Sequence, residues 1–442
     1  MSSTCEPELL VALCHRIQLD YPVPYDSRRD TLSPTFQGDF EHDDLSSYDW
    51  ASISESIASL CVFESKGQVI ALAVDRDLTA KQTEILLAEN DEVHDKTYEF
   101  IQNRFAVEHP SVKRIHDTVY NHILDRLKGR ASKYYKKMGK EIKKKYPDYK
   151  PEEVAAPSDM EGFDELHSFI YTLYKITQEG SVDKEPWNKF RGKPDEGLEA
   201  EKIEGLVQRY WKKIVNVKRS IGILLNNVKN PLFVKYLERE VKVNRLGQPA
   251  AALNIPPQDS VATFFNADGA LHALHITGQC SIDKIKEITK KLSNPKPLYK
   301  NLPVHCEIKI LDFLAQNSDR FKSIDYVGVT KLACAGCHLY FEAFAKVVRR
   351  VRKKGQHGKF YFPWGLPDWS GVHKEDGRRL RHEILSLAIK EWNQRAQYGE
   401  GPEQVAGEEG TSTRSQRGAS ESTVGSFFVV SDDVEEVLRT AY

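Results

Sequence analysis

The residues that most constrain this chain lie between positions 303 and 337, where one histidine, one glutamate and two cysteines have the spacing of a metal site. His305 and Glu307 form a His-x-Glu pair, and Cys334 and Cys337 form a Cys-x-x-Cys pair. One imidazole and two thiolates are three zinc ligands, and a catalytic zinc keeps its fourth position open for water. The combination therefore predicts a zinc ion held by His305, Cys334 and Cys337.

The local pattern places both pairs at helix starts. Pro303, followed by apolar residues at helical spacing, predicts a helix whose first turn carries His305 and Glu307 into one pocket. Residues 321–329 are rich in β-branched and aromatic side chains and predict a buried strand. A second helical pattern opens at the Cys-x-x-Cys pair, where a helix N-terminus favours thiolates and i, i+3 spacing puts both sulfurs on one face.

These motifs resemble the zinc-dependent cytidine deaminase-like superfamily, whose signature is H-x-E followed by P-C-x-x-C. They are more similar to a fungal-expanded branch of predicted nucleic-acid or nucleotide deaminases with H-[AC]-E, C-x-x-C and H-G-K-x-Y, followed by Trp and Pro. The last part reads here from His357 to Tyr361, with Trp364 behind it. Ala333 replaces the proline of the superfamily signature, a residue that binds no metal. The resemblance covers roughly residues 255–395.

The resemblance implies an α/β fold, with a three-layer α/β/α deaminase-like domain over residues 255–396. It also implies a zinc-dependent hydrolytic deaminase that acts on a cytosine or adenine base, in a nucleic acid or a nucleotide. Glu307 would be the catalytic residue, which takes a proton from water and delivers it to the ring nitrogen and then to the leaving ammonia.

A basic run follows the second predicted metal helix, and aromatic residues follow the run. Cations there either border the substrate or complement the helix dipole, and the rings either wall a pocket or pack in the core. The residues that we expect at the substrate are Arg349, Arg350, Arg352, Lys353, His357, Lys359 and Trp364.

A purely structural zinc site is the main alternative. Such a site closes with a fourth protein ligand, which Cys306, His338 or His357 could supply. Buried free cysteines are common, so Cys306 is more typical of a small core residue. With a closed site, the protein would be a non-catalytic nucleic-acid-binding or protein-binding module, or an inactive deaminase-like scaffold.

Residues 1–245 contain no comparable cluster, and helical spacing dominates over 79–103. We therefore expect a mostly α-helical N-terminal accessory domain there, whose protein partners the sequence does not identify. Residues 397–425 are rich in Gly, Ser, Glu and Thr, so a disordered linker is expected. Residues 426–442 would form a short C-terminal tail.

The most basic segment of the chain spans residues 126–150. It holds eleven Lys or Arg against two acids, and four tyrosines are interleaved. Cations suit phosphates and rings suit bases, so the segment predicts contact with nucleic acid. The alternative is the solvated outer face of a long helix.

Composition narrows the class of protein further. The formal net charge is −1, so an argument for nucleic acid must rest on local patches. The seven cysteines are an odd, scattered set, which indicates a reducing compartment and no disulfide framework. The first residues of the sequence lack the basic start and apolar block of a signal peptide, and the sequence contains no run of about 18 apolar residues. We therefore expect an intracellular protein of the cytoplasm or nucleus, with no membrane partner.

Overall fold

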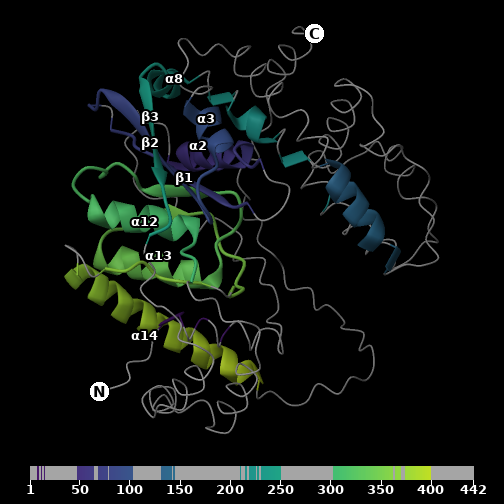
Figure 1. The fold of residues 1–442 in the computed structure, drawn as a ribbon, viewed down its shortest axis with the longest axis vertical. Coiled ribbons are helices and arrows are strands. Elements are labelled where there is room, and N and C mark those ends of the chain that lie inside the picture. The colour runs from purple at the N-terminus through teal and green to yellow at the C-terminus, as the bar shows by residue number, and fades with distance from the viewer. Residues whose placement is uncertain are drawn as a thin grey trace, which may run out of the picture. The chain divides into compact units, whose positions relative to one another are not determined.

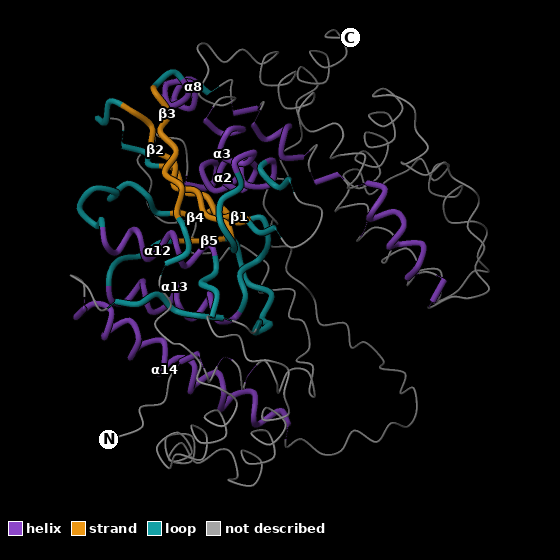
Figure 2. The backbone as a smooth tube through the Cα atoms, in the orientation of Figure 1, coloured by secondary structure: helices purple, strands orange, loops and turns teal. Residues whose placement is uncertain are grey.

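The computed structural model describes residues 7–8, 11, 14, 47–63, 68–77, 79–102, 131–141, 143–144, 210, 215–216, 219–224, 226–227, 230–249, 302–361, 364–369 and 374–399. The described elements group into two compact units, each of which is treated by itself below. Figure 1 labels the helices and strands, and Figure 2 colours them by type.

One unit is built on four strands. They are β1 (Ile70–Val74), β2 (Gln82–Glu89), β3 (Glu240–Leu246) and β4 (Tyr326–Val329). Their order is β3-β2-β1-β4. β1 pairs antiparallel with both β2 and β4, whereas β2 and β3 run parallel. Every residue of β1 and of β4 is buried, as expected of central strands.

Three helices accompany these strands: α2 (Ser47–Leu60), α3 (Asp95–Phe100) and α8 (Pro231–Leu237). α2 packs on β1 and β4. It approaches so closely that a Cβ atom on Gly328 would lie 2.5 Å from the backbone carbon of Ser54. Trp50 of α2 meets the ring of Tyr236 edge to face, with 4.7 Å between the ring centroids, which ties α8 to α2.

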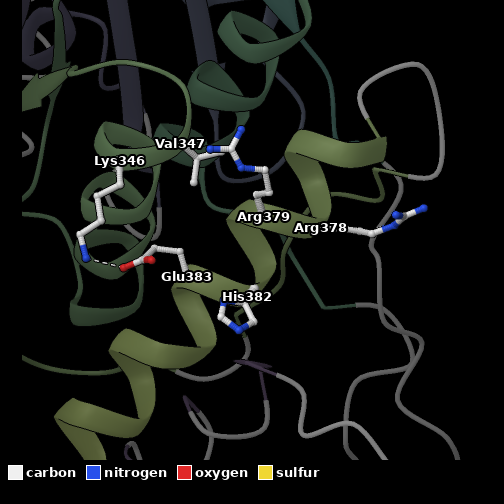
Figure 3. Close-up of a pocket in the computed structure, with 6 residues that line it drawn as sticks. All are labelled: Lys346, Val347, Arg378, Arg379, His382 and Glu383. Atoms are coloured by element: carbon white, nitrogen blue, oxygen red, sulfur yellow. Dashed lines mark hydrogen bonds and ion pairs between the residues drawn. The ribbon is translucent and has the colours of Figure 1, made fainter.

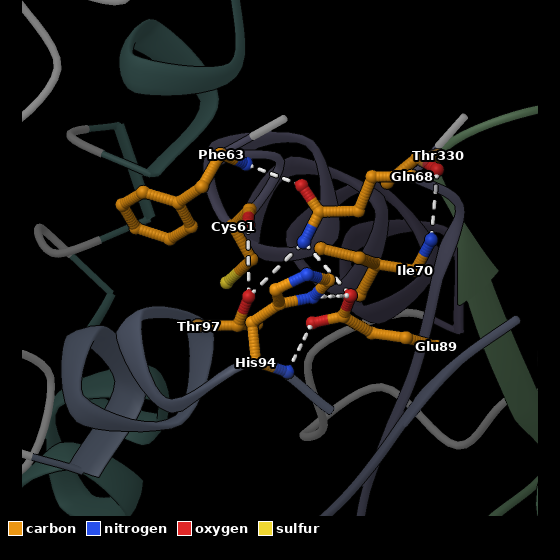
Figure 4. Close-up of polar contacts among 8 residues, drawn as sticks. All are labelled: Cys61, Phe63, Gln68, Ile70, Glu89, His94, Thr97 and Thr330. Carbon is orange, nitrogen blue, oxygen red and sulfur yellow. Dashed lines mark hydrogen bonds and ion pairs between the residues drawn. The ribbon is translucent and has the colours of Figure 1, made fainter. Parts of the chain in front are cut away.

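A buried carboxylate joins the end of β2 to the start of α3. Glu89, 1% exposed, accepts hydrogen bonds from the backbone N–H of His94 (3.1 Å) and from Gln68 Nε2 (2.9 Å), and it lies 2.6 Å from His94 Nδ1. Gln68 Nε2 also donates to Thr97 Oγ1, whose hydroxyl donates to the carbonyl of Cys61 (Figure 4). The burial of Glu89 is therefore offset by several donors, as a buried charge requires.

The other unit contains α12 (Cys306–Gln316), α13 (Ala335–Val347), the two-residue β5 (Arg352–Lys353) and α14 (Lys374–Gly399). α13 packs between α12 and α14, as Figure 1 shows. Trp369 lies in the segment between α13 and α14 and attaches this segment to α12, because its Nε1 donates to the buried Asp312 of α12 at 2.8 Å. Its side chain lies so close to Gly377 of α14 that a Cβ there would overlap it.

The predicted fold class is confirmed in its coarser part. The four strands β3, β2, β1 and β4 form a mixed sheet accompanied by helices, so the described part of the chain is α/β. The mostly helical accessory domain over 1–245 is not confirmed, because β1, β2 and β3 all come from that range. The helical assignment of 79–103 is wrong for β2, which is held as a strand by its pairing with β1 and β3.

Some of the predicted regions lie outside the described residues. Residues 250–301 and 400–442, which include part of the predicted deaminase-like domain and most of the predicted linker and tail, lie outside the described residues. Among the helices that are described, none is long and apolar enough to cross a membrane.

Candidate metal centre

His305 occupies the N-cap of α12. Its backbone is extended (φ −67°, ψ 150°), and its carbonyl accepts from the N–H groups of Ile308 (2.9 Å) and Lys309 (3.1 Å). The imidazole makes no capping hydrogen bond to the helix. Just before it, the carbonyl of Pro303 accepts from the N–H of Gly365 at 2.9 Å. The helix start and the hydrogen bond from Gly365 therefore fix the backbone from which the imidazole projects.

Cys334 occupies the N-cap of α13, and its sulfur accepts from the backbone N–H of Cys337 at 3.3 Å. The chain is held on both sides of Cys334. The N–H of Ala335 donates to the carbonyl of Lys359 (2.9 Å), and the carbonyl of Ala333 accepts from the N–H of His357 (3.2 Å). The start of α13 thus presents two sulfurs, and residues 357–359 brace the backbone there through these two hydrogen bonds.

The three predicted ligand atoms form a compact triangle. The sulfurs of Cys334 and Cys337 are 3.3 Å apart, and His305 Nδ1 lies 3.3 Å from the Cys337 sulfur and 3.7 Å from the Cys334 sulfur. In a tetrahedral zinc site, with bonds of about 2.3 Å to sulfur and about 2.0 Å to nitrogen, ligand atoms lie about 3.5–3.8 Å apart. The donor set and its spacing therefore fit zinc.

The protonation of the two thiols also fits a metal site. Burial opposes ionisation of Cys334, but the hydrogen bond from Cys337 and the adjacent His305 outweigh it and hold the pKa of Cys334 well below its usual value. Burial, the hydrogen bond to Cys334 and the charge of Cys334 raise the pKa of Cys337 well above its usual value. The lowered pKa of Cys334 favours the deprotonated sulfur that a metal needs, and metal binding would release any thiol proton that remains.

Glu307 lies one residue inside α12 and is 4% exposed. The thiol of Cys306 donates to Glu307 Oε2 at 3.2 Å. Burial raises the pKa of Cys306 well above its usual value, as does the charge of Glu307, so this thiol stays protonated and remains a donor. The sequence placed Cys306 in the core or at a fourth ligand position and did not predict this contact. The one indication of the contact in the sequence is that Cys306 directly precedes Glu307.

No fourth protein ligand joins the triangle in the part of the chain that the structure describes. The donor atoms of His305, Cys334 and Cys337 all lie within 4.8 Å of one another, and neither Cys306, His338 nor His357 belongs to the group. Three ligands are the set of a catalytic zinc site, whereas a structural site is closed by four.

The expected substrate residues divide into two groups. Arg349 and Arg350 follow the C-terminal end of α13, about 18 Å along the helix from the cysteines, so the structure does not bring them to the metal ligands. Lys353 of β5 does lie near the site. Burial lowers its pKa, while the charges of Cys337 and Glu307 raise it. Its neighbour Arg352 is partly exposed on the same short strand.

The segment that braces Cys334 carries two more expected substrate residues. Burial lowers the pKa of His357, whereas the charge of Cys334 raises it, so the ring lies near the metal ligands. It meets the half-exposed ring of Tyr361 edge to face, with 5.0 Å between centroids. Gly358 between them has φ 68°, a conformation that glycine adopts readily. Lys359 is exposed.

Trp364 is fully buried against the turn that carries Cys337. A Cβ atom on Gly336 would lie 2.9 Å from Trp364 Cε2 and 3.1 Å from Nε1, so only glycine leaves room for the indole. Trp364 Nε1 has no hydrogen-bond partner among the described residues, but the indole lies beside Cys337 and partly opposes the rise in the pKa of that thiol. Its N–H is therefore a donor beside the sulfur of a candidate metal ligand.

Trp364→Phe should weaken zinc binding, because the Cys337 thiolate then loses a neighbouring donor. Outer-shell partners of this kind change metal affinity about 10- to 100-fold. Competition with a chromophoric chelator measures the dissociation constant. Trp369→Phe is the matched control, because it removes an indole N–H from Asp312. An equal shift in both variants, or none in Trp364→Phe, contradicts the assignment.

A separate hollow of about 390 Å³ lies between α13 and α14 and away from the ligand triangle (Figure 3). It is lined by Lys346, Val347, Arg378, Arg379, His382 and Glu383. Lys346 pairs with Glu383, Arg378 with Glu375 and Arg379 with Asp376. The cations are therefore balanced by acids, and the hollow supports no ligand assignment.

Comparison with known families points to the same segment of the chain. Residues 304–368 match the family model described as OTT_1508_deam-like deaminase, and this stretch contains the three ligand candidates and Glu307. The match supports a hydrolytic deaminase family, and the His305, Cys334 and Cys337 group could hold the metal that deaminases commonly use. Neither the curated proteins nor the solved structures give a significant match to the chain.

Proposed function

We propose that this chain, whose residues 304–368 carry a deaminase-family segment, is a zinc-dependent hydrolytic deaminase of a cytosine or adenine base. The observation that carries the proposal is the juxtaposition of one imidazole and two thiols with a buried carboxylate at the first turn of α12. Three ligands and a carboxylate that is not a ligand are what hydrolytic base deamination requires.

His305 Nδ1 and the sulfurs of Cys334 and Cys337 would hold the ion. When bound, zinc supplies a water molecule whose pKa is lowered towards neutrality. The fit rests on the donor triangle, on the low pKa of Cys334 and on the buried indole N–H of Trp364 beside Cys337.

Glu307 moves the protons. Its Oε2 accepts from the Cys306 thiol, so we assign proton transfer to Oε1. Oε1 accepts a proton from the attacking water and delivers it to the ring nitrogen next to the amino-bearing carbon. The hydroxyl group now on the attacked carbon then loses its proton, Oε1 passes that proton to the amino group, the C–N bond breaks, and ammonia leaves. Water is consumed, and a carbonyl replaces the amino group.

Side chains between positions 353 and 359 would hold the rest of the substrate. Lys353, His357 and Lys359 are suited to a phosphate, because the first two lie near the metal ligands and the third is exposed beside them. A nucleotide or a nucleic acid strand carries the phosphate that these groups can bind, whereas a free base does not. We therefore expect the former to be the better substrate.

The proposed function is tested by ammonia release from a panel of cytosine and adenine substrates. The panel contains nucleosides, nucleotides, and single-stranded DNA and RNA with one target base each. Zinc-loaded protein should turn over at least one of the two bases, and chelation should abolish the activity. If zinc-loaded protein releases no ammonia from any member, the closed structural site becomes the better interpretation.

A further inference from the structure

The helix described over residues 131–141 and 143–144 places five exposed lysines along one face. They are Lys136, Lys137, Lys140, Lys143 and Lys144, hereafter the lysine face. At 100° per residue, all five lie within an arc of about 120° and over about 12 Å of helix axis. Figure 1 draws this helix in blue. Within the described part of the chain, no ion pair involves any of them.

The opposite side of the helix is packed against the protein. Ala131 and Met138 are buried, and the ring of Tyr134 packs against the buried Tyr210 with 6.3 Å between centroids. Glu141, the one acid within 131–144, accepts the hydroxyl of Tyr210 at 2.5 Å. The acid and the ring of Tyr134 therefore lie outside the arc of the lysines, which leaves that face purely cationic.

Concentrating lysines in this way destabilises the helix itself. Lys136 and Lys140, and Lys140 and Lys144, are like charges at i, i+4, each of which disfavours the helix by about 0.2–0.5 kcal/mol. A bound polyanion would relieve this repulsion. In double-stranded DNA, each strand carries a phosphate about every 3.4 Å of helix axis, a density similar to that of the five lysines.

We propose that the lysine face binds the phosphate backbone of a nucleic acid, without reading its sequence. The choice of nucleic acid over another polyanion rests on the proposed function. The existence of the cationic face rests only on the exposed lysines. A membrane surface fits less well, because the apolar side of this helix is buried and cannot enter a bilayer. The interleaved tyrosines suggested base stacking, but Tyr134 packs on Tyr210 and does not share the lysine face.

Binding of a fluorescein-labelled 20-nucleotide single strand to the full chain, followed by anisotropy at several salt concentrations, tests the proposal. The variant Lys136→Gln/Lys140→Gln/Lys143→Gln removes three cations from the face. Each phosphate contact contributes about 0.7 to the slope of log K against log salt for single strands, so the slope should flatten by about 2. Affinity at 0.1 M salt should fall on the order of 100-fold, and homopolymers and mixed sequences should bind alike.

The matched control is Lys81→Gln/Lys96→Gln/Lys242→Gln, which removes three exposed lysines elsewhere in the same unit. It should keep the affinity and slope of the unchanged protein. Equal losses in the two triple variants, or no loss in the lysine-face variant, overturn the proposal. So does tighter binding to phosphatidylserine vesicles than to the oligonucleotide. Binding is read without turnover, so an inactive protein that still binds through this face contradicts the proposed function alone.

Discussion

Glu307→Gln should retain zinc and fold while losing turnover by a factor on the order of 10³. The glutamine has the shape of the glutamate, and its amide oxygen can still accept from the Cys306 thiol. It cannot take a proton from water or return one to the ring nitrogen. Initial rates of ammonia release, normalised to zinc content, measure the loss.

Asp312→Asn is the matched control for this substitution. Asp312 is a second buried carboxylate on α12, 5% exposed, and it accepts from Trp369 Nε1 and Gln316 Nε2. Its replacement should lower the free energy of unfolding by about 1–3 kcal/mol and leave turnover per folded molecule unchanged. If Glu307→Gln instead loses zinc, Glu307 is a ligand and the proposed proton transfer is wrong.

Cys334→Ser/Cys337→Ser should lower the zinc content from about one ion per chain to near zero. A serine hydroxyl does not ionise near neutral pH and is a much weaker ligand than a thiolate. Elemental analysis of protein purified without chelator gives the stoichiometry. Because metal binding and folding are linked, zinc should raise the melting temperature of the unchanged protein and not that of the variant.

Cys61→Ser serves as the control for lost thiols. Cys61 is also fully buried, but it lies outside the ligand group. This variant should keep about one zinc per chain even if it unfolds more easily. A double variant at Cys334 and Cys337 that still binds one zinc per chain would place the metal elsewhere.

The three candidate ligands could be predicted because they come from two short sequence motifs, His-x-Glu and Cys-x-x-Cys. His305 and the Cys-x-x-Cys pair both open helices, and residue types at helix starts can be recognised without knowing the tertiary fold. The contact of Trp364 with Gly336 was not predictable, because it joins residues 28 positions apart through packing alone. The donor role of Cys306 also depends on burial, which the motif does not specify.

The sheet was harder to foresee. Ile85 to Ala88 of β2 is a continuous apolar run, which fits a buried strand or a buried helix equally well. Its identity is decided by pairing with β1 and with β3, whose first residue, Glu240, lies opposite Gln82. The position of Arg349 and Arg350 depends on tertiary structure in the same way. They follow the cysteines closely in sequence, but the length of α13 separates them in space.

X-ray absorption at the zinc edge tests the central claim most directly, because it counts the ligands of the bound ion. Zinc-loaded protein should show two sulfurs at about 2.3 Å, with one nitrogen and one further light atom at about 2.0–2.1 Å. Addition of a small anion should change only the light-atom shell. A third sulfur from Cys306, or a shell that no anion perturbs, would reveal a closed structural site and contradict the account of a catalytic zinc.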